Sequence, residues 1–458
     1  MHLSAAVPAP WRGFWDRFAF PPSESAEESR AFREHLLSSF WAGTSGGVFL
    51  LTDVILAKTL NATGWQMTLM ASLGPIASLM SFAWVGLVTG KRRGSSFFLA
   101  ALLGKIPIVL VLVFKTATYM VFMTFLSSLI GALMMTGTNS IYQACYSEKT
   151  RAHRYALATS VGTVFSILSA QVSGAILERN ERVWPYLFVI SALMSLLAVY
   201  HTYRMDVASG DRRDARAWLR MGAESLRSSV RTRPHFEPAG VGRSFGDAVR
   251  ISRENPEFFR FEMNFMVYGI AFLAILPIFP LYIVNELKMN YTQLSATKGV
   301  WSQAGQMVLS PLLGILLVRM RPMRFTGQFF LLLMLYPLCI LASTFASGDE
   351  RIAWVWGAVL LFSVAMAGVN LSWNMSSIYF AGEADAATFQ GLHIAMTGVR
   401  GLFAPALGYF LYAHGGTRVV FSFSTALFAV AAWMMFAQEK RTRQSRLATE
   451  ALERGAAA

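Results

Sequence analysis

The feature of this sequence that most limits its fold is a series of twelve apolar blocks, each about 20 residues or longer. An α-helix of that length crosses the hydrocarbon core of a bilayer, where each backbone polar group must be satisfied inside the segment. The sequence therefore predicts an all-α integral membrane protein with twelve transmembrane helices. The blocks occupy residues 35–58, 65–89, 95–114, 118–146, 155–177, 183–203, 258–285, 294–318, 325–346, 352–381, 387–413 and 417–437.

A polar stretch separates the first six blocks from the last six, and the two sets echo one another. Phe32-Arg33 precedes the first block as Phe259-Arg260 precedes the seventh, and Ser140-Ile141-Tyr142 ends the fourth block as Ser377-Ile378-Tyr379 ends the tenth. Nearly constant offsets of this kind are typical of two parallel six-helix repeats. We expect two pseudo-symmetric bundles. The segments are a cytoplasmic N-terminal segment 1–34, a bundle 35–203, a cytoplasmic linker 204–257, a bundle 258–437 and a cytoplasmic tail 438–458.

The basic residues are concentrated in alternate loops, and this fixes the expected orientation. The chain carries a formal net charge of +14. Lysine and arginine cluster in cytoplasmic loops of membrane proteins, so the charge indicates topology and not a nucleic-acid partner. We expect a multi-pass protein of the inner (plasma) membrane with both termini in the cytoplasm. The basic residues of the cytoplasmic loops and tail are Lys91, Arg92, Arg93, Lys149, Arg151, Arg154, Arg319, Arg321, Arg324, Lys440, Arg441, Arg443 and Arg446.

The linker contains one segment of mixed character, in which Trp218, Leu219 and Met221 alternate with arginines. Such a segment is typical of a helix on the membrane surface. A solvated flexible linker is the equally open alternative.

Motifs that carry enzyme chemistry are missing from the sequence. Cys145 and Cys339 lie singly in apolar blocks, and no His/Glu metal spacing, Gly-rich phosphate loop or nucleophile elbow is present. We expect no enzymatic activity and no cofactor.

These features together resemble the major facilitator superfamily over nearly the whole chain. The resemblance rests on six plus six spans, a long central loop, and a glycine followed by basic residues after spans 2 and 8. Gly86 and Gly314 are those glycines, and Gly90 stands where the family signature has an aspartate. The resemblance implies that spans 1, 4, 7 and 10 line a central cavity and that spans 2, 5, 8 and 11 form the seam between bundles. It also implies conformational loops, which here would comprise Gly86, Lys91, Arg92, Arg93, Gly314, Arg319 and Arg321.

Arg400 is a permanent charge near the middle of span 11, and His393 lies two turns earlier on the same helix face. A charge at mid-bilayer costs about 3 kcal/mol and usually faces a cavity or a partner. Arg400 is therefore a candidate anchor for a carboxylate or phosphate of the cargo, assisted by His393. The alternative is a structural arginine bonded to backbone carbonyls.

Asp53, Lys298 and Lys105 are the other charges of interest within the spans. Asp53 is a candidate carrier of a coupling proton, because burial raises the pKa of a carboxyl group. It could instead be a fixed partner of Arg400 or Lys298, or an interfacial residue. Lys105, in a scaffold span, is more consistent with a packed pair than with a cargo contact.

Neutral polar residues gather on single faces of several spans, at helical spacing. Such faces either line a hydrated chamber or bridge helices. The residues taken as candidate cargo contacts are Asn139, Gln143, Tyr268, Gln303, Gln306, Asn370, Trp373 and Asn374.

The sequence thus predicts a secondary transporter that works by alternating access. It would act as a monomer on a small organic anion, with proton coupling or exchange. An exporter of drugs or lipid-like amphiphiles is the alternative within this class, and a non-transporting membrane sensor on the same fold is the alternative outside it.

Overall fold

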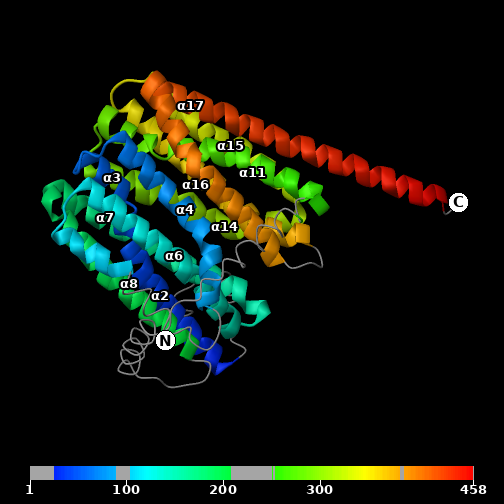
Figure 1. Ribbon diagram of the computed structural model, residues 1–458, viewed down its shortest axis with the longest axis horizontal. Coiled ribbons are helices and arrows are strands. Elements are labelled where there is room, and N and C mark those ends of the chain that lie inside the picture. Colours follow the sequence, from blue (N-terminus) through cyan, green and yellow to red (C-terminus); the bar gives the residue numbers. More distant parts are fainter. Residues whose placement is uncertain (1–24, 89–103, 208–249, 251–252, 382–385, 457–458) are drawn as a thin grey trace, which may run out of the picture.

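The computed structural model describes residues 25–88, 104–207, 250, 253–381 and 386–456, which form helices and connecting turns (Figure 1). Wherever their residues are described, the twelve predicted spans lie largely within helical structure, and several of the helices extend beyond the predicted ends. The expected amphipathic part of the linker and the basic loop residues Lys91, Arg92 and Arg93 lie outside the described residues.

The helical segments of the first bundle correspond to spans 1 to 6. Only the second part of span 3 is described, where residues 104–109 are helical and continue into the 3-10 turn η2 (Leu110–Leu112). The others are α2 (Ala26–Phe49), α3 (Thr52–Lys58), α4 (Gly64–Val88), α6 (Ala117–Cys145), α7 (Glu148–Arg179), η3 (Glu181–Val183) and α8 (Trp184–Val207), with α2 and α3 together forming span 1.

The second bundle repeats this arrangement with more interruptions in its helices. Span 7 consists of α11 (Pro256–Ile275), α12 (Ile278–Leu281) and the π-helical turn η4 (Tyr282–Glu286). Span 8 consists of α13 (Tyr291–Ser295), the π-helical turn η5 (Ala296–Trp301) and α14 (Ser302–Arg319). The remaining helices are α15 (Pro322–Ser343), α16 (Glu350–Ala381) and α17 (Ala386–Ala456).

Helix α17 contains both span 11 and span 12, and the chain turns back at Gly416. That residue has φ 71°, a left-handed conformation that glycine adopts without the steric cost of a β-carbon. Beyond the bundle the helix continues to Ala456 and projects away from it (Figure 1).

Local chemistry fixes several helix ends. The Ser25 hydroxyl accepts from the backbone N–H of Glu28, and Thr116 does the same for Tyr119. Asn290 and Gln293 form a reciprocal capping box at the start of α13. These side chains satisfy backbone donors that have no partner inside the helix.

By length and hydropathy, seven helical segments among the described residues can cross a membrane. The last of them, Leu392–Ser445, is 54 residues long and contains the turn at Gly416. It therefore holds two of the predicted spans.

The two ends of the molecule differ, and we name them for reference. The terminal end is where α2 and α11 begin and α8 ends, and the loop end is where α3 ends and α4 begins (Figure 1). The bundles meet through α4 against α17 and through α7 against α13 and α14. Span 2 therefore meets span 11, and span 5 meets span 8. These are the spans that the resemblance assigns to the seam between the bundles.

Within the first bundle, α2 and α7 approach so closely that the contact depends on glycine. A β-carbon at Gly43 would overlap the carbonyl group of Gly162. Small residues allow such close backbone approach between helices in a membrane, where van der Waals packing drives association.

We expect Gly43→Leu to lower the free energy of unfolding by about 1–3 kcal/mol, because overpacking forces the backbones apart. Thermal unfolding in detergent measures this. Gly357→Leu is the matched control, since a β-carbon at Gly357 has no atom within 4 Å. Equal effects of the two substitutions would contradict the α2–α7 contact.

Candidate functional site

The two bundles are joined at the loop end by hydrogen bonds between helix ends. Lys58 Nζ donates to the Met289 carbonyl at 3.0 Å, and the hydroxyls of Thr59 and Tyr291 hydrogen-bond to each other. The backbone N–H of Tyr291 donates to Glu178 Oε2 at 2.5 Å. Each bond links a residue of the first bundle to one of the second.

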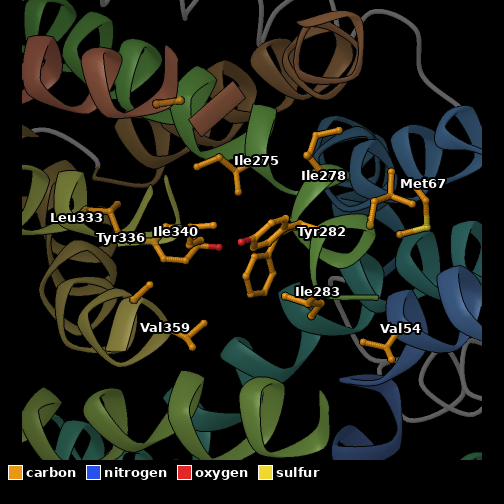
Figure 2. Packing of buried hydrophobic residues seen from close by; sticks show 14 of the residues in the cluster. Val54, Met67, Ile275, Ile278, Tyr282, Ile283, Leu333, Tyr336, Ile340 and Val359 are labelled. Atoms are coloured by element: carbon orange, nitrogen blue, oxygen red, sulfur yellow. The ribbon is translucent and has the colours of Figure 1, made fainter. Parts of the chain in front are cut away.

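An apolar cluster beneath these bonds also includes residues of both bundles. Figure 2 shows Val54 of α3 and Met67 of α4 with Ile278 of α12 and Ile283 of η4. All four are nearly fully buried, and α12 contacts both α3 and α4. Burial of this kind excludes water, so the loop end is closed.

One face of α7 shows that the seam opens toward the terminal end. Its residues Gly174 and Ala170 are buried and lie against Ser295 and Gly299 of the second bundle. Thr159 and Tyr155 stand about three and four helical turns before Ala170, on the same side of the helix, and both are exposed, Tyr155 by 48%. The face that contacts the other bundle at the loop end is therefore uncovered at the terminal end.

Asp53 and Lys298 form an ion pair across the seam. Lys298 Nζ lies 2.5 Å from Asp53 Oδ2, and the side chains are 21% and 23% exposed, respectively. Oδ1 of Asp53 is buried without a hydrogen-bond partner among the described residues. Asp53 thus meets Lys298, one of the two partners that the sequence allowed, and its role as a proton carrier stays a prediction.

Arg400 lies in the interface between α17 and α11 and is 5% exposed. Its Nη1 donates to the Phe265 carbonyl, and its Nη2 donates to Thr397 Oγ1 at 3.1 Å. The guanidinium carbon lies 5.6 Å from the centre of the Tyr268 ring. A β-carbon at Gly269 would overlap the guanidinium group, so α11 needs glycine there to admit the side chain. Nε of Arg400 is buried without a hydrogen-bond partner in the described part of the chain.

His393 is paired with an acid that the sequence analysis missed. Its Nδ1 lies 2.8 Å from Oε1 and 2.9 Å from Oε2 of Glu262, which belongs to α11. The side chains of His393 and Glu262 are 3% and 1% exposed, respectively. Glu262 also interacts electrostatically with Arg400. The acid stands early in span 7, within Phe258-Phe259-Arg260-Phe261-Glu262, and its position inside an apolar block was the signal that could have identified it.

Trp373 and Asn370 of α16 lie on the interior face of that helix. The Trp373 ring packs edge-on against His393, with ring centroids 5.1 Å apart. Asn370 is exposed and donates from Nδ2 to Gln306 Oε1 at 2.9 Å. Ser363, on the same face, accepts from the Gln306 backbone N–H at 3.1 Å. An exposed amide on this face indicates an interior space open to water.

The other predicted contacts are distributed as follows. Tyr268 is buried, and its hydroxyl lies 3.6 Å from Met366 Sδ. Gln303 is half-buried on α14. Lys105 lies over the ring of Phe49, with Nζ 5.9 Å from the centroid, and Arg321 Nη1 lies 3.1 Å from Glu439 Oε1. The side chains of Asn139, Gln143, Asn374 and Arg319, and the surroundings of Gly86 and Gly314, are outside what the structure describes.

Two helical bundles, apolar spans and a buried cluster of charged side chains beside a water-accessible interior are features of a multi-pass membrane transporter. The family model of the Major Facilitator Superfamily matches residues 36–399. The chain belongs to this superfamily. No curated protein sequence matches it at a significant level.

Solved structures of the same fold support the assignment. A nucleoside transporter, NupG, aligns with TM-score 0.63 and 15% identity over 90% of this chain and 99% of its own. A POT family transporter in complex with 5-aminolevulinic acid aligns with TM-score 0.66 and 13% identity over 89% and 96%. A bacterial homolog of the human lysosomal transporter Spinster aligns with TM-score 0.60 and 13% identity over 91% and 98%.

We expect Gly269→Ala to destabilise the protein by about 1–3 kcal/mol, because the new methyl group displaces the guanidinium of Arg400. The same substitution should cost much less when Arg400 is already alanine. Thermal unfolding of the two single variants and the double variant measures this coupling. Additive effects would show that Gly269 and Arg400 do not share the interface.

Proposed function

We propose that this transporter carries a small organic anion by alternating access, coupled to protons or to exchange. The observation that carries the proposal is the difference between the two ends of the seam. The α7 face is covered by the second bundle at Gly174 and exposed at Tyr155. A cavity closed at one end and open at the other is one of the two states that alternating access requires.

The basic residues favour the cytoplasm as the side to which the molecule is open. Arg321, Lys440 and Arg441 lie at the terminal end, and such residues are retained on the cytoplasmic side. On this proposal the state is inward-facing, like the solved structure of the Spinster homolog. Both termini are then cytoplasmic, residues 35–203 and 258–437 are the two moving bundles, and the protein acts as a monomer in the inner membrane.

The anionic cargo is supported by the charges of the second bundle. Arg400, permanently charged, and His393, which can be protonated, lie near the single carboxylate of Glu262. Arg400 also retains a buried Nε donor without a partner among the described residues. Asn370 and Gln306 offer polar groups on the adjoining face of the interior.

A thermal-shift screen of purified protein tests the cargo class. The panel contains mono- and dicarboxylates, phosphate esters, lysophospholipids and cationic drugs. At 100-fold excess over Kd a bound ligand stabilises by about 2.7 kcal/mol, which is a shift of several degrees. An anion should stabilise the wild type but not Arg400→Ala. It should not stabilise Arg400→Lys either, because lysine keeps the charge but lacks the planar guanidinium group that binds a carboxylate or phosphate through two hydrogen bonds.

Arg418→Ala is the matched control, because Arg418 is exposed and bonded to Thr344 far from the cavity. Stabilisation by amphiphiles alone, equal in wild type and Arg400→Ala, would overturn the anionic cargo. An anion that passes the screen should also show counterflow in proteoliposomes, and its absence would contradict transport.

Loss of the Asp53–Lys298 pair should shift the protein away from the state closed at the loop end. We expect Asp53→Asn to change the ratio of the two states by roughly five-fold, the equivalent of about 1 kcal/mol. Spin labels at Thr63 and Thr292, both exposed and in opposite bundles, report the separation by pulsed electron resonance, in a background with Cys145 and Cys339 replaced by serine.

The charge-reversed pair Asp53→Lys with Lys298→Asp should restore the wild-type distances. Arg182→Ala, which removes an exposed charge at the same end, is the control. A distance distribution unchanged in Asp53→Asn would mean that the ion pair does not help to close the seam.

A further inference from the structure

The pair formed by Glu262 and His393 joins span 7 to span 11 in the apolar interior of the second bundle. The imidazole Nδ1 lies within 2.9 Å of both carboxylate oxygens. Phe265 packs edge-on against the imidazole at 5.0 Å between ring centroids. An ionised carboxylate in such a place is costly unless it is paired, so the hydrogen bond to His393 is what makes Glu262 tolerable there.

The two imidazole nitrogens have different surroundings. The tautomer that places its hydrogen on Nδ1 donates it to Glu262, which leaves a lone pair on Nε2. Nε2 is buried and has no hydrogen-bond partner among the described residues. A basic nitrogen without a donor opposite it, beside a carboxylate that favours the imidazolium, is a place where one additional proton can bind.

The groups around the pair affect how readily His393 binds that proton. Arg400 on α17 interacts electrostatically with Glu262 and opposes a second positive charge nearby. Tyr268 on α11 contacts Arg400 through its ring, and α15 contributes Phe330, which packs on Phe265 at 5.2 Å. On the α16 side, half-buried Trp373 contacts His393, one turn from the exposed Asn370. Among the described side chains, Arg400 and Tyr268 are the titratable groups beside the pair.

We propose that Glu262 and His393 form the proton-carrying site of the transport cycle, with Trp373 as the side chain between this site and the cavity. The inference rests on the proposed function, which left the coupling group open. A proton from water on the cavity side adds to Nε2, so that a neutral imidazole beside a carboxylate becomes an imidazolium–carboxylate pair. Release of the same proton to water restores the first form, and no other bond changes.

The charge balance connects this proton to an anionic cargo. Arg400 and ionised Glu262 together are neutral, so the protonated cluster carries one net positive charge and the deprotonated cluster carries none. The protonated form therefore attracts an anion into the cavity more strongly. The cluster links α11 to α17, a helix that also packs against α4 across the seam, so its charge can bias the position of the bundles.

Trp373 gives a direct optical signal for the first test, because an imidazolium quenches an adjacent indole more than a neutral imidazole does. The difference in fluorescence between wild type and Trp373→Phe isolates this residue from the other tryptophans. We expect the difference signal to fall along a one-proton titration curve as the pH drops. If this difference in fluorescence does not change with pH, the proposal is overturned. This test needs no substitution of Glu262 or His393.

The variants then identify the group that titrates. His393→Gln should abolish the titration, and Glu262→Gln should alter the curve, because the carboxylate that hydrogen-bonds to the imidazole is gone. Arg418→Ala, which removes an exposed charge bonded to Thr344, is the control and should leave the curve unchanged. A curve that persists in His393→Gln would assign the proton to another group.

Spin labels at Thr159 and Leu316, exposed on α7 and α14, test the link to conformation without any cargo. The wild type should change its distance distribution with pH, His393→Gln should not, and Glu262→Gln should do so only along its own titration curve. Equal pH responses in all three proteins would refute the coupling role and leave alternating access intact. A wild type fixed in one state under all conditions would instead refute the proposed function.

Discussion

A bilayer offers no water to a buried polar group, and most features of this structure follow from that constraint. Backbone groups are satisfied inside helices, which explains why the described spans are helical. Buried charges are satisfied by partners, and two such pairs have different consequences. Asp53 and Lys298 belong to different bundles and favour one position of the bundles. Glu262 and His393 both belong to the second bundle, so this pair does not depend on how the two bundles are placed relative to each other.

The closed loop end and the open terminal end result from the same packing surface. Along α7, small residues meet the second bundle at Gly174 and Ala170, where α13 and η5 fit closely. Toward Thr159 and Tyr155 the surface turns polar and is exposed. A polar surface can face water in one state and be covered in the other at modest cost, whereas an apolar one would favour permanent closure. The sequence of α7 therefore fits a seam that opens from this end.

The spans were predictable because they depend on local length, hydropathy and a repeated pattern, whereas the seam was implied by the resemblance to the superfamily. Arg400 was identifiable by depth alone. The partner of His393 was not, because Glu262 is 131 positions away in the chain and stands near the start of a span, among flanking charges such as Arg260. Nor could the sequence reveal the contact between Gly269 and Arg400, which depends on how closely α11 and α17 approach. Pairing between helices is tertiary information, and one sequence without related sequences carries little of it.

The repeat itself shows how the two bundles have diverged in chemistry. Phe32 and Phe259 are separated by 227 positions, and the same spacing relates His35 to Glu262. At the first position His35 Nδ1 lies 3.0 Å from the Tyr146 hydroxyl and its ring stacks on Tyr142. At the second, a carboxylate meets an imidazole. A neutral phenol offers no charge that stabilises an imidazolium, whereas the carboxylate at the second position does. A pseudo-symmetric scaffold with one such site can couple protonation to the motion of one bundle relative to the other.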